Sequence, residues 1–350
     1  TPASGRVYLS SARGEARSEN GNSNDYFGNI GDRAVDLISA DRSPSAAVGF
    51  GGFQEQGHPI YVGDGNFSMI SDGFGALGYA SFGANAFNRA SGCGSVALGF
   101  LTLAGPQTVV EGGINGNNVG QFSAGWGSRA IGNISTATGY RNTASGGASV
   151  AMGNYNYATG DATIALGKEN WAEGASTVAI GFKNHAAGDG SVALGQENVA
   201  WGTTNFTSGY QNVAGDVNAA VGTGGSATAM GKLNTASADA SMALNRGTSA
   251  TNQAATSMGF RTISDNLGML AIGVNNAAGI GDPTANRYFY ANGTDTGAPP
   301  GVAFVIGNGD IKTDAVGNPL PERGDNPRNA FVVNYDGSAT LSGELTINSD

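Results

Sequence analysis

The central part of the chain has a fourteen-residue repeat, and this period is what most constrains its fold. A glycine, here called the lead glycine, recurs at Gly125, Gly139, Gly153, Gly167, Gly181, Gly195 and Gly209. The spacing resumes at Gly231 and passes through Asn245 to Gly259 and Gly273. Asparagine occupies the third position after most lead glycines, alanine the fifth, and often a second glycine the seventh. Because several positions agree from unit to unit, each unit is one structural repeat.

A unit of this length with two glycines seven positions apart predicts two short strands and two tight turns. A helix is disfavoured, because each glycine in a helix costs about 1 kcal/mol relative to alanine. Val178 and Ile180 alternate with Ala179, which is the period of a strand, and we expect the large residues to face the interior. The sequence therefore predicts an all-β fold, a parallel β-roll or β-solenoid of stacked two-strand coils.

The asparagines at the third position are predicted to face the interior and to form an amide ladder from coil to coil, which would satisfy buried polar groups. These structural residues are Asn142, Asn156, Asn170, Asn184, Asn198, Asn212 and Asn234. Such a coil encloses only a thin core, and its sheet faces carry alanine and little charge. We therefore expect the chain to pack with copies of itself as a homotrimer.

The composition argues against several classes of function. A net charge of −10 disfavours nucleic acid and anionic lipid as partners, and no apolar run is long enough to insert in a membrane. The single cysteine, Cys93, excludes an intrachain disulfide and a cysteine-ligated zinc site. Two histidines leave little for histidine-based catalysis, and the acidic string GNGD (307–310) lacks the ligand spacing of a calcium loop. We expect neither an enzyme, nor a cofactor, nor a metal site.

The repeat unit S-x-A-[LIM]-G-x-x-N-x-A-x-G resembles the head repeat of trimeric autotransporter adhesins, variants of which also occur in phage tail fibres. The resemblance covers residues 73–279 and implies a left-handed parallel β-roll that trimerises. The sequence departs from the pattern in three places, with extra residues at 79–92, an insertion at 101–121 and a slip at 215–225. We expect bulged loops or a broken coil there.

Both flanks of the repeat also resemble segments of phage fibre proteins. The stretch 31–52 is similar to one that precedes such repeats, so residues 1–72 are predicted to be an attachment region. Residues 280–350 are predicted to form a β-structured tip, with strands in 302–310 and 329–348 and a turn at Asp336-Gly337. These strings resemble the stretch before the self-cleaving intramolecular chaperone of tail fibres. The resemblance implies processing at Ser349-Asp350, with the chaperone absent from this chain.

Candidate binding residues are aromatic. The fourth position after the lead glycine is predicted to face outward, and it forms a stripe of Tyr157, Trp171 and His185. Two interpretations stay open, a platform for sugar rings or a contact with a neighbouring subunit. The insertion at 101–121 and the tip residues Tyr288 and Tyr290 are further candidates, because binding residues concentrate on irregular segments held by rigid scaffolds.

These features together predict a structural and adhesive segment of a homotrimeric fibre, located on a virion as part of a tail fibre, or otherwise extracellular at a cell surface. Its partners would be its own copies, a virion attachment protein, and a host-surface glycan or protein. Two other classes stay open. One is a cell-anchored bacterial trimeric adhesin, and the other is a polysaccharide depolymerase built on a fibre.

Overall fold

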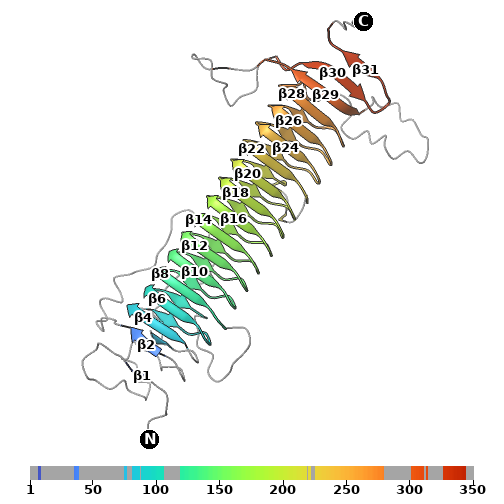
Figure 1. Cartoon of the computed structure of the whole chain (residues 1–350). Coiled ribbons are helices and arrows are strands. Elements are labelled where there is room, and N and C mark those ends of the chain that lie inside the picture. Colours follow the sequence, from blue (N-terminus) through green and yellow to red (C-terminus); the bar gives the residue numbers. More distant parts are fainter. Residues whose placement is uncertain are drawn as a thin grey trace, which may run out of the picture. The chain divides into compact units, whose positions relative to one another are not determined.

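The computed structural model describes residues 7–8, 35–38, 75–76, 81–86, 88–105, 119–218, 220–221, 225–279, 301–310, 313 and 326–343. These residues form strands and turns without any helix, so none among them could cross a membrane as a helix. The chain divides into two compact units, Thr1–Ala162 and Thr163–Asp350, which we describe separately. In each unit parallel strands stack coil upon coil (Figure 1). The predicted all-β, parallel β-solenoid fold with one repeat per coil is confirmed.

Unit 1 contains a sheet of mostly long strands and a sheet of short strands. The first consists of β1 (Val7–Tyr8), β2 (Val35–Ile38), β4 (Phe82–Ala86), β6 (Val96–Phe100), β8 (Phe122–Trp126), β10 (Thr136–Tyr140) and β12 (Val150–Asn154). The second consists of β3 (Gly75–Ala76), β5 (Arg89–Ala90), β7 (Leu103–Ala104), β9 (Arg129–Ala130), β11 (Thr143–Ala144) and β13 (Tyr157–Ala158). From β4 onward each coil contributes one strand to each sheet.

Unit 2 repeats this plan and ends in a small antiparallel addition. Its long strands are β14 (Ile164–Lys168), β16 (Val178–Phe182), β18 (Val192–Gln196), β20 (Phe206–Tyr210), β22 (Thr228–Lys232), β24 (Met242–Arg246), β26 (Thr256–Phe260) and β28 (Leu270–Val274). Its short strands are β15 (Trp171–Ala172), β17 (His185–Ala186), β19 (Val199–Ala200), β21 (Val213–Ala214), β23 (Thr235–Ala236), β25 (Ser249–Ala250) and β27 (Ile263–Ser264). The addition consists of β29 (Val302–Asn308), β30 (Asn329–Asn334) and β31 (Ala339–Leu341).

The interior of the coils is built from small side chains. Ala179 on β16 and Ala186 on β17 both have zero exposure, and so do their equivalents in the neighbouring coils. The expectation that the large residues face inward is therefore wrong: Val178 is only half-buried and Ile180 is 38% exposed. Inward asparagine and alanine from the short-strand side already fill the narrow space, so only small residues fit opposite them: alanine in most coils, and Ser123, Thr207 and Ser257 in the others.

The lead glycines are required by the close stacking of the coils. Gly181 has a φ of +125°, and a Cβ built on it would lie 2.0 Å from the carbonyl oxygen of Gly195 in the next coil. Both the backbone conformation and the lack of space exclude a side chain there. Two residues further on, Lys183 adopts a φ of +55°, and its amide donates to the carbonyl of Lys168 at 3.0 Å.

The three sequence departures have different outcomes. The expected irregularity at 79–92 is wrong, because Gly75 pairs with Arg89 and Phe82 with Val96, each exactly one repeat later in the sequence. The insertion at 101–121 does not break the roll, since Val96 pairs with Phe122 in register. Likewise, Phe206 pairs with Thr228 across the slip at 215–225. In these last two places the coil continues on both sides of the extra residues, of which 106–118, 219 and 222–224 lie outside the described residues.

The C-terminal part of unit 2 extends the long-strand sheet. β29 pairs in parallel with β28, placing Gly307 beside Gly273, and β30 and β31 follow antiparallel. Larger side chains fill the interior here, where Met269, Val302 and Val305 pack together. The strands predicted within 302–310 and 329–348 are thus present, with a turn at Asp336-Gly337 between β30 and β31. The domain boundaries at 72/73 and 279/280 stay predictions.

Candidate functional site

The outward face of the long-strand sheet in unit 2 is apolar, and we call it the apolar face. It is formed by the first and third residues of the long strands, which align from coil to coil. Its most exposed members are Ile180 (38%), Met230 (41%), Met242 (38%), Met258 (37%) and Leu270 (36%). Its polar members are Ser208, Thr228 and Thr256. Single exposed apolar residues are normal, but apolar residues that recur on every long strand mark an interaction surface. In unit 1 the same position of β12 holds Met152, which is 43% exposed.

The outward face of the short-strand sheet, which we call the outer face, is different. In unit 2 its first row runs Trp171, His185, Val199, Val213, Thr235, Ser249 and Ile263, and its second row runs Glu173, Ala187, Trp201, Gly215, Ser237, Thr251 and Asp265. Large rings therefore gather in only three successive coils. Apart from the carboxylates Glu173 and Asp265, the rest of this face is small, hydroxylic or aliphatic.

The rings of this group contact one another edge to face. The centroid of His185 lies 5.7 Å from that of Trp171, with 81° between the ring planes, and 5.5 Å from that of Trp201, with 85°. The Nε2 atom of His185 is 3.2 Å from Oε2 of Glu173. Both side chains are partly exposed, at 25% and 31%. We call these four residues the Trp-His-Trp cluster.

Two of the predicted binding residues, Trp171 and His185, lie on adjacent strands of unit 2. Tyr157 belongs to β13 of unit 1 and is half-buried there. The residues Tyr288, Tyr290, Ser349 and Asp350 lie outside the described residues. Sequence reasoning missed Trp201, which stands at the sixth position of its unit rather than the fourth. Period-two alternation places both positions on the same outward face, so the signal was available.

The seven predicted asparagines are buried and hydrogen-bonded from coil to coil. Within unit 2, Nδ2 of Asn184 donates to Oδ1 of Asn170 (3.0 Å), and Oδ1 of Asn184 accepts from both the amide and Nδ2 of Asn198 (3.0 Å each). The ladder continues through Asn212 to Asn234, and within unit 1 it joins Asn142 to Asn156. All seven have 0–1% exposure. Their role is to satisfy polar groups in the interior.

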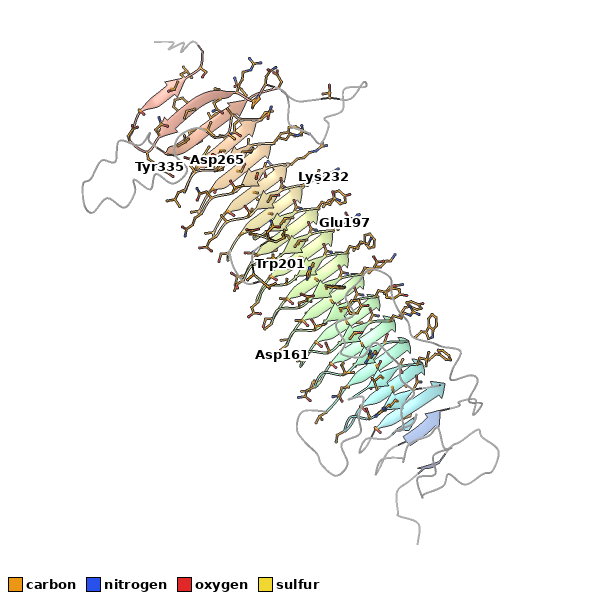
Figure 2. All side chains as sticks on the ribbon, turned by 180° about the vertical axis from the view of Figure 1, so that it is seen from behind. Asp161, Glu197, Trp201, Lys232, Asp265 and Tyr335 are labelled. Carbon is orange, nitrogen blue, oxygen red and sulfur yellow. The ribbon has the colours of Figure 1, made fainter. Side chains whose placement is uncertain are left out.

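The two turn edges of unit 2 carry opposite charge. At the C-terminal ends of the long strands, Lys168 and Lys183 lie 5.3 and 5.2 Å from the ring centroid of Phe182, and Lys232 lies 5.3 Å from that of Tyr210. Figure 2 shows Glu197 and Lys232 along this edge, away from Trp201. The opposite turns carry the exposed Asp189 and Asp239 and, within the described residues of unit 2, no basic residue.

One carboxylate on the basic edge has a perturbed pKa. The side-chain amides of Gln196 and Gln211 donate to the two Glu197 oxygens at 3.1 and 2.6 Å. These hydrogen bonds, together with the nearby ammonium of Lys183, hold the pKa of Glu197 below its usual value. Glu197 thus places a carboxylate on the basic edge, where it interacts favourably with the ammonium of Lys183.

Comparison with protein families identifies the repeat. The family model described as "YadA head domain repeat (2 copies)" matches residues 144–170, 158–184, 172–198 and 223–244. The first three matches begin one repeat apart, at the inward alanines of successive coils. These residues are trimeric-autotransporter-like head repeats. Such repeats indicate an adhesin-type fibre protein with a structural role, exposed at a surface or outside the cell. No curated protein matches the chain.

Proposed function

We propose that this chain is a structural and adhesive segment of a homotrimeric fibre that attaches to a host surface. The apolar face carries the proposal. From β14 to β26 the interior of the coils holds mainly alanine, asparagine and other small residues, so the large apolar side chains of these long strands lie outside it. Burying a whole isoleucine or methionine side chain is worth about 1.5–3 kcal/mol, so covering the exposed two-fifths of each gains about 1 kcal/mol. Repeated along the sheet, this gain favours association.

A threefold arrangement with the apolar faces at its centre also suits the charges. In a closed ring, one turn edge of each copy lies beside the opposite turn edge of the next. The basic edge with Lys183 and Lys232 would then meet the acidic edge with Asp189 and Asp239. Complementary potentials of this kind fix the orientation of subunits more than they add affinity.

The tail-fibre assignment rests on the two flanking regions. The strand β2 lies in the segment 31–52 that resembles phage fibre sequences, and it pairs with β4 as an extension of the long-strand sheet. Strands β29 to β31 occupy the stretch that resembles the region before a fibre chaperone. We propose that the fibre belongs to a virion and that Ser349-Asp350 is a processing point. A cell-anchored bacterial adhesin is the second candidate, because the matched family describes head repeats of that kind of protein.

The mass of the native assembly tests the proposal. Light scattering should give about 105 kDa (3 × 34.9 kDa) for the parent chain. Replacing Ile180 and Met230 by glutamate puts charges into the apolar face and should lower the mass toward that of one chain. The matched variant Thr235→Glu places one charge on the outer face and should remain trimeric. A parent mass of 34.9 kDa would reject the trimer.

A separate assay addresses activity. The protein is incubated with host capsule or surface polysaccharide, and the solution is analysed for new reducing ends and unsaturated sugars. The adhesive fibre predicts binding with no change in either. A hydrolytic depolymerase would release new reducing ends, and a lyase would release reducing ends together with unsaturated sugars.

A further inference from the structure

The Trp-His-Trp cluster is a local exception on the outer face. Trp171, His185 and Trp201 occupy three successive coils, while the following first-row positions hold valine, threonine, serine and isoleucine. We propose that this cluster is a binding subsite for uncharged pyranose units of a host-surface glycan. The proposal rests on the proposed adhesive function and names its ligand class.

The position leaves the cluster accessible in the proposed trimer. The apolar face belongs to the long strands, and the cluster lies on the short-strand sheet, whose outward side chains point away from the interior in the opposite direction. If the apolar faces meet at the threefold axis, the outer face of each copy remains toward solvent. Of the two interpretations that the sequence left open, this arrangement favours a platform for sugar rings over a contact with a neighbouring subunit. A neighbouring subunit would cover the apolar face and leave the outer face, with its half-buried rings, toward solvent.

The cluster is held rigidly by the roll. The amide of Trp171 donates to the carbonyl of Asn184 (2.8 Å), and that of His185 donates to Asn198 (2.8 Å). The amide of Trp201 is bonded in the same way to the carbonyl of Ala214 at 2.9 Å. Each ring therefore stands on backbone that is fixed to the next coil. A site whose anchors are already ordered loses little conformational entropy when a ligand binds.

The chemistry suits a sugar ring. Trp171 and Trp201 are two coils apart, which corresponds to about 10 Å along the stack at roughly 4.8 Å per strand. In the second row, Ala187 stands between Glu173 and Trp201; it is a small residue and only 3% exposed. Indole rings offer apolar surfaces to the C–H faces of a pyranose, and the Glu173 carboxylate accepts hydrogen bonds from hydroxyls.

The charge of the site selects among sugars. Glu173 is 31% exposed beside His185, and the chain as a whole carries −10. A uronate or sulfated sugar placed over this carboxylate would meet like charge, which costs binding energy. The cluster should therefore prefer neutral hexoses and N-acetylhexosamines. The two indoles would contact sugar units at two levels of the stack, so an oligosaccharide should bind better than a monosaccharide.

Tryptophan fluorescence tests the subsite directly, because the chain has only three tryptophans, Trp126, Trp171 and Trp201. In the variant Trp126→Phe, all indole emission comes from the cluster. It is titrated with mannan, galactan and chitin oligosaccharides and, as the charged probe, with alginate. We expect a saturable blue shift with at least one neutral probe and none with alginate. The variant with Trp171→Phe and Trp201→Phe retains Trp126 and should show no shift.

Binding to the responsive polysaccharide, immobilised on a sensor surface, gives the second readout. Trp171→Ala with Trp201→Ala should weaken binding at least tenfold, whereas the matched outer-face variant Ile263→Ala should bind like the parent. Each variant is checked for trimer mass and for the circular dichroism of its β-structure. A trimer that responds to no probe, or to alginate alone, overturns the subsite and leaves the fibre proposal standing. A monomeric parent chain rejects the trimer, and the titration still decides the subsite.

Discussion

Replacing Asn184 by alanine should open the roll locally, because its side chain joins three coils. Its Nδ2 donates to Asn170 Oδ1 (3.0 Å) and Gly195 O (2.7 Å), and its Oδ1 accepts the amide of Asn198. Alanine leaves that amide buried without its acceptor, which costs about 1–3 kcal/mol, and it removes the other bonds as well. We expect a total of about 3 kcal/mol, or about a 100-fold loss of protection.

Native-state hydrogen exchange at the Asn198 amide measures this loss. The matched variant is Asn184→Thr, because the chain itself places Thr248 in the ladder, where its hydroxyl donates to Oδ1 of Asn234 at 2.8 Å. Threonine retains one donor and one acceptor, so the expected cost is about 1 kcal/mol, roughly a fivefold loss. Equal exchange in parent and alanine variant, or a threonine variant that exchanges faster than alanine, would refute the role of the ladder.

Three other perturbations follow from the same structure. Gly181→Ala should destabilise the assembly severely, because its Cβ would lie 2.0 Å from the carbonyl oxygen of Gly195. Gly120→Ala, whose Cβ would have no atom within 4 Å, should cost about 1 kcal/mol. Thermal unfolding of the two variants measures the difference. Gln211→Ala should raise the pKa of Glu197, followed by a carbon-13 NMR titration of its carboxyl. The folded-state pKa of Glu197 is lowered below 4.5, so the stability that Glu197 contributes is present above about pH 4.5 and is lost as the pH falls through that folded-state pKa. If the pKa of Glu197 were the same in the Gln211→Ala variant as in the parent, the hydrogen bond from Gln211 would not be a cause of the lowered pKa. The double variant Lys183→Glu with Lys232→Glu should weaken the trimer at low salt, as measured by dissociation in a dilution series. Adding Asp189→Lys with Asp239→Lys should restore the trimer. If it does not, the basic edge of one copy does not lie beside the acidic edge of the next.

The sequence predicted the roll because its glycines recur at places where the backbone tolerates no side chain. It did not predict which face of the long strands is interior. Alternation at Val178, Ala179 and Ile180 defines two faces but does not say which is buried. That depends on the width left by Asn184 and Ala186 across the coil, a tertiary property. Those small residues were nevertheless visible in the sequence, and they would have indicated that only Ala179 fits opposite them.

The candidate site was predicted in part. Trp171 and His185 were found by their common position in the unit. Trp201 was missed because it belongs to another row and meets His185 only through the diagonal between neighbouring coils. Contacts of that kind depend on the directions of side chains on neighbouring strands, and these directions cannot be read from the alignment of one position in the repeat. Extra residues were expected at 101–121 and 215–225. The strand pairing shows that Leu103-Ala104 still belong to a regular coil and that the coil continues past both segments.

Spin-label distances test most directly which sheet lies at the centre of the assembly. In a Cys93→Ser background, a single labelled cysteine replaces Ile180 on the apolar face or Thr235 on the outer face. If the apolar face lies at a threefold axis, a label on the outer face is farther from that axis than a label on the apolar face by about 10 Å, the spacing of stacked sheets. The distance between labels on two subunits is √3 times their distance from the axis, so it is about 17 Å longer for the outer label. We predict one short distance at residue 180 and a longer one at residue 235. The reverse order, or the absence of any dipolar coupling at either position, would contradict the trimer on which the account depends.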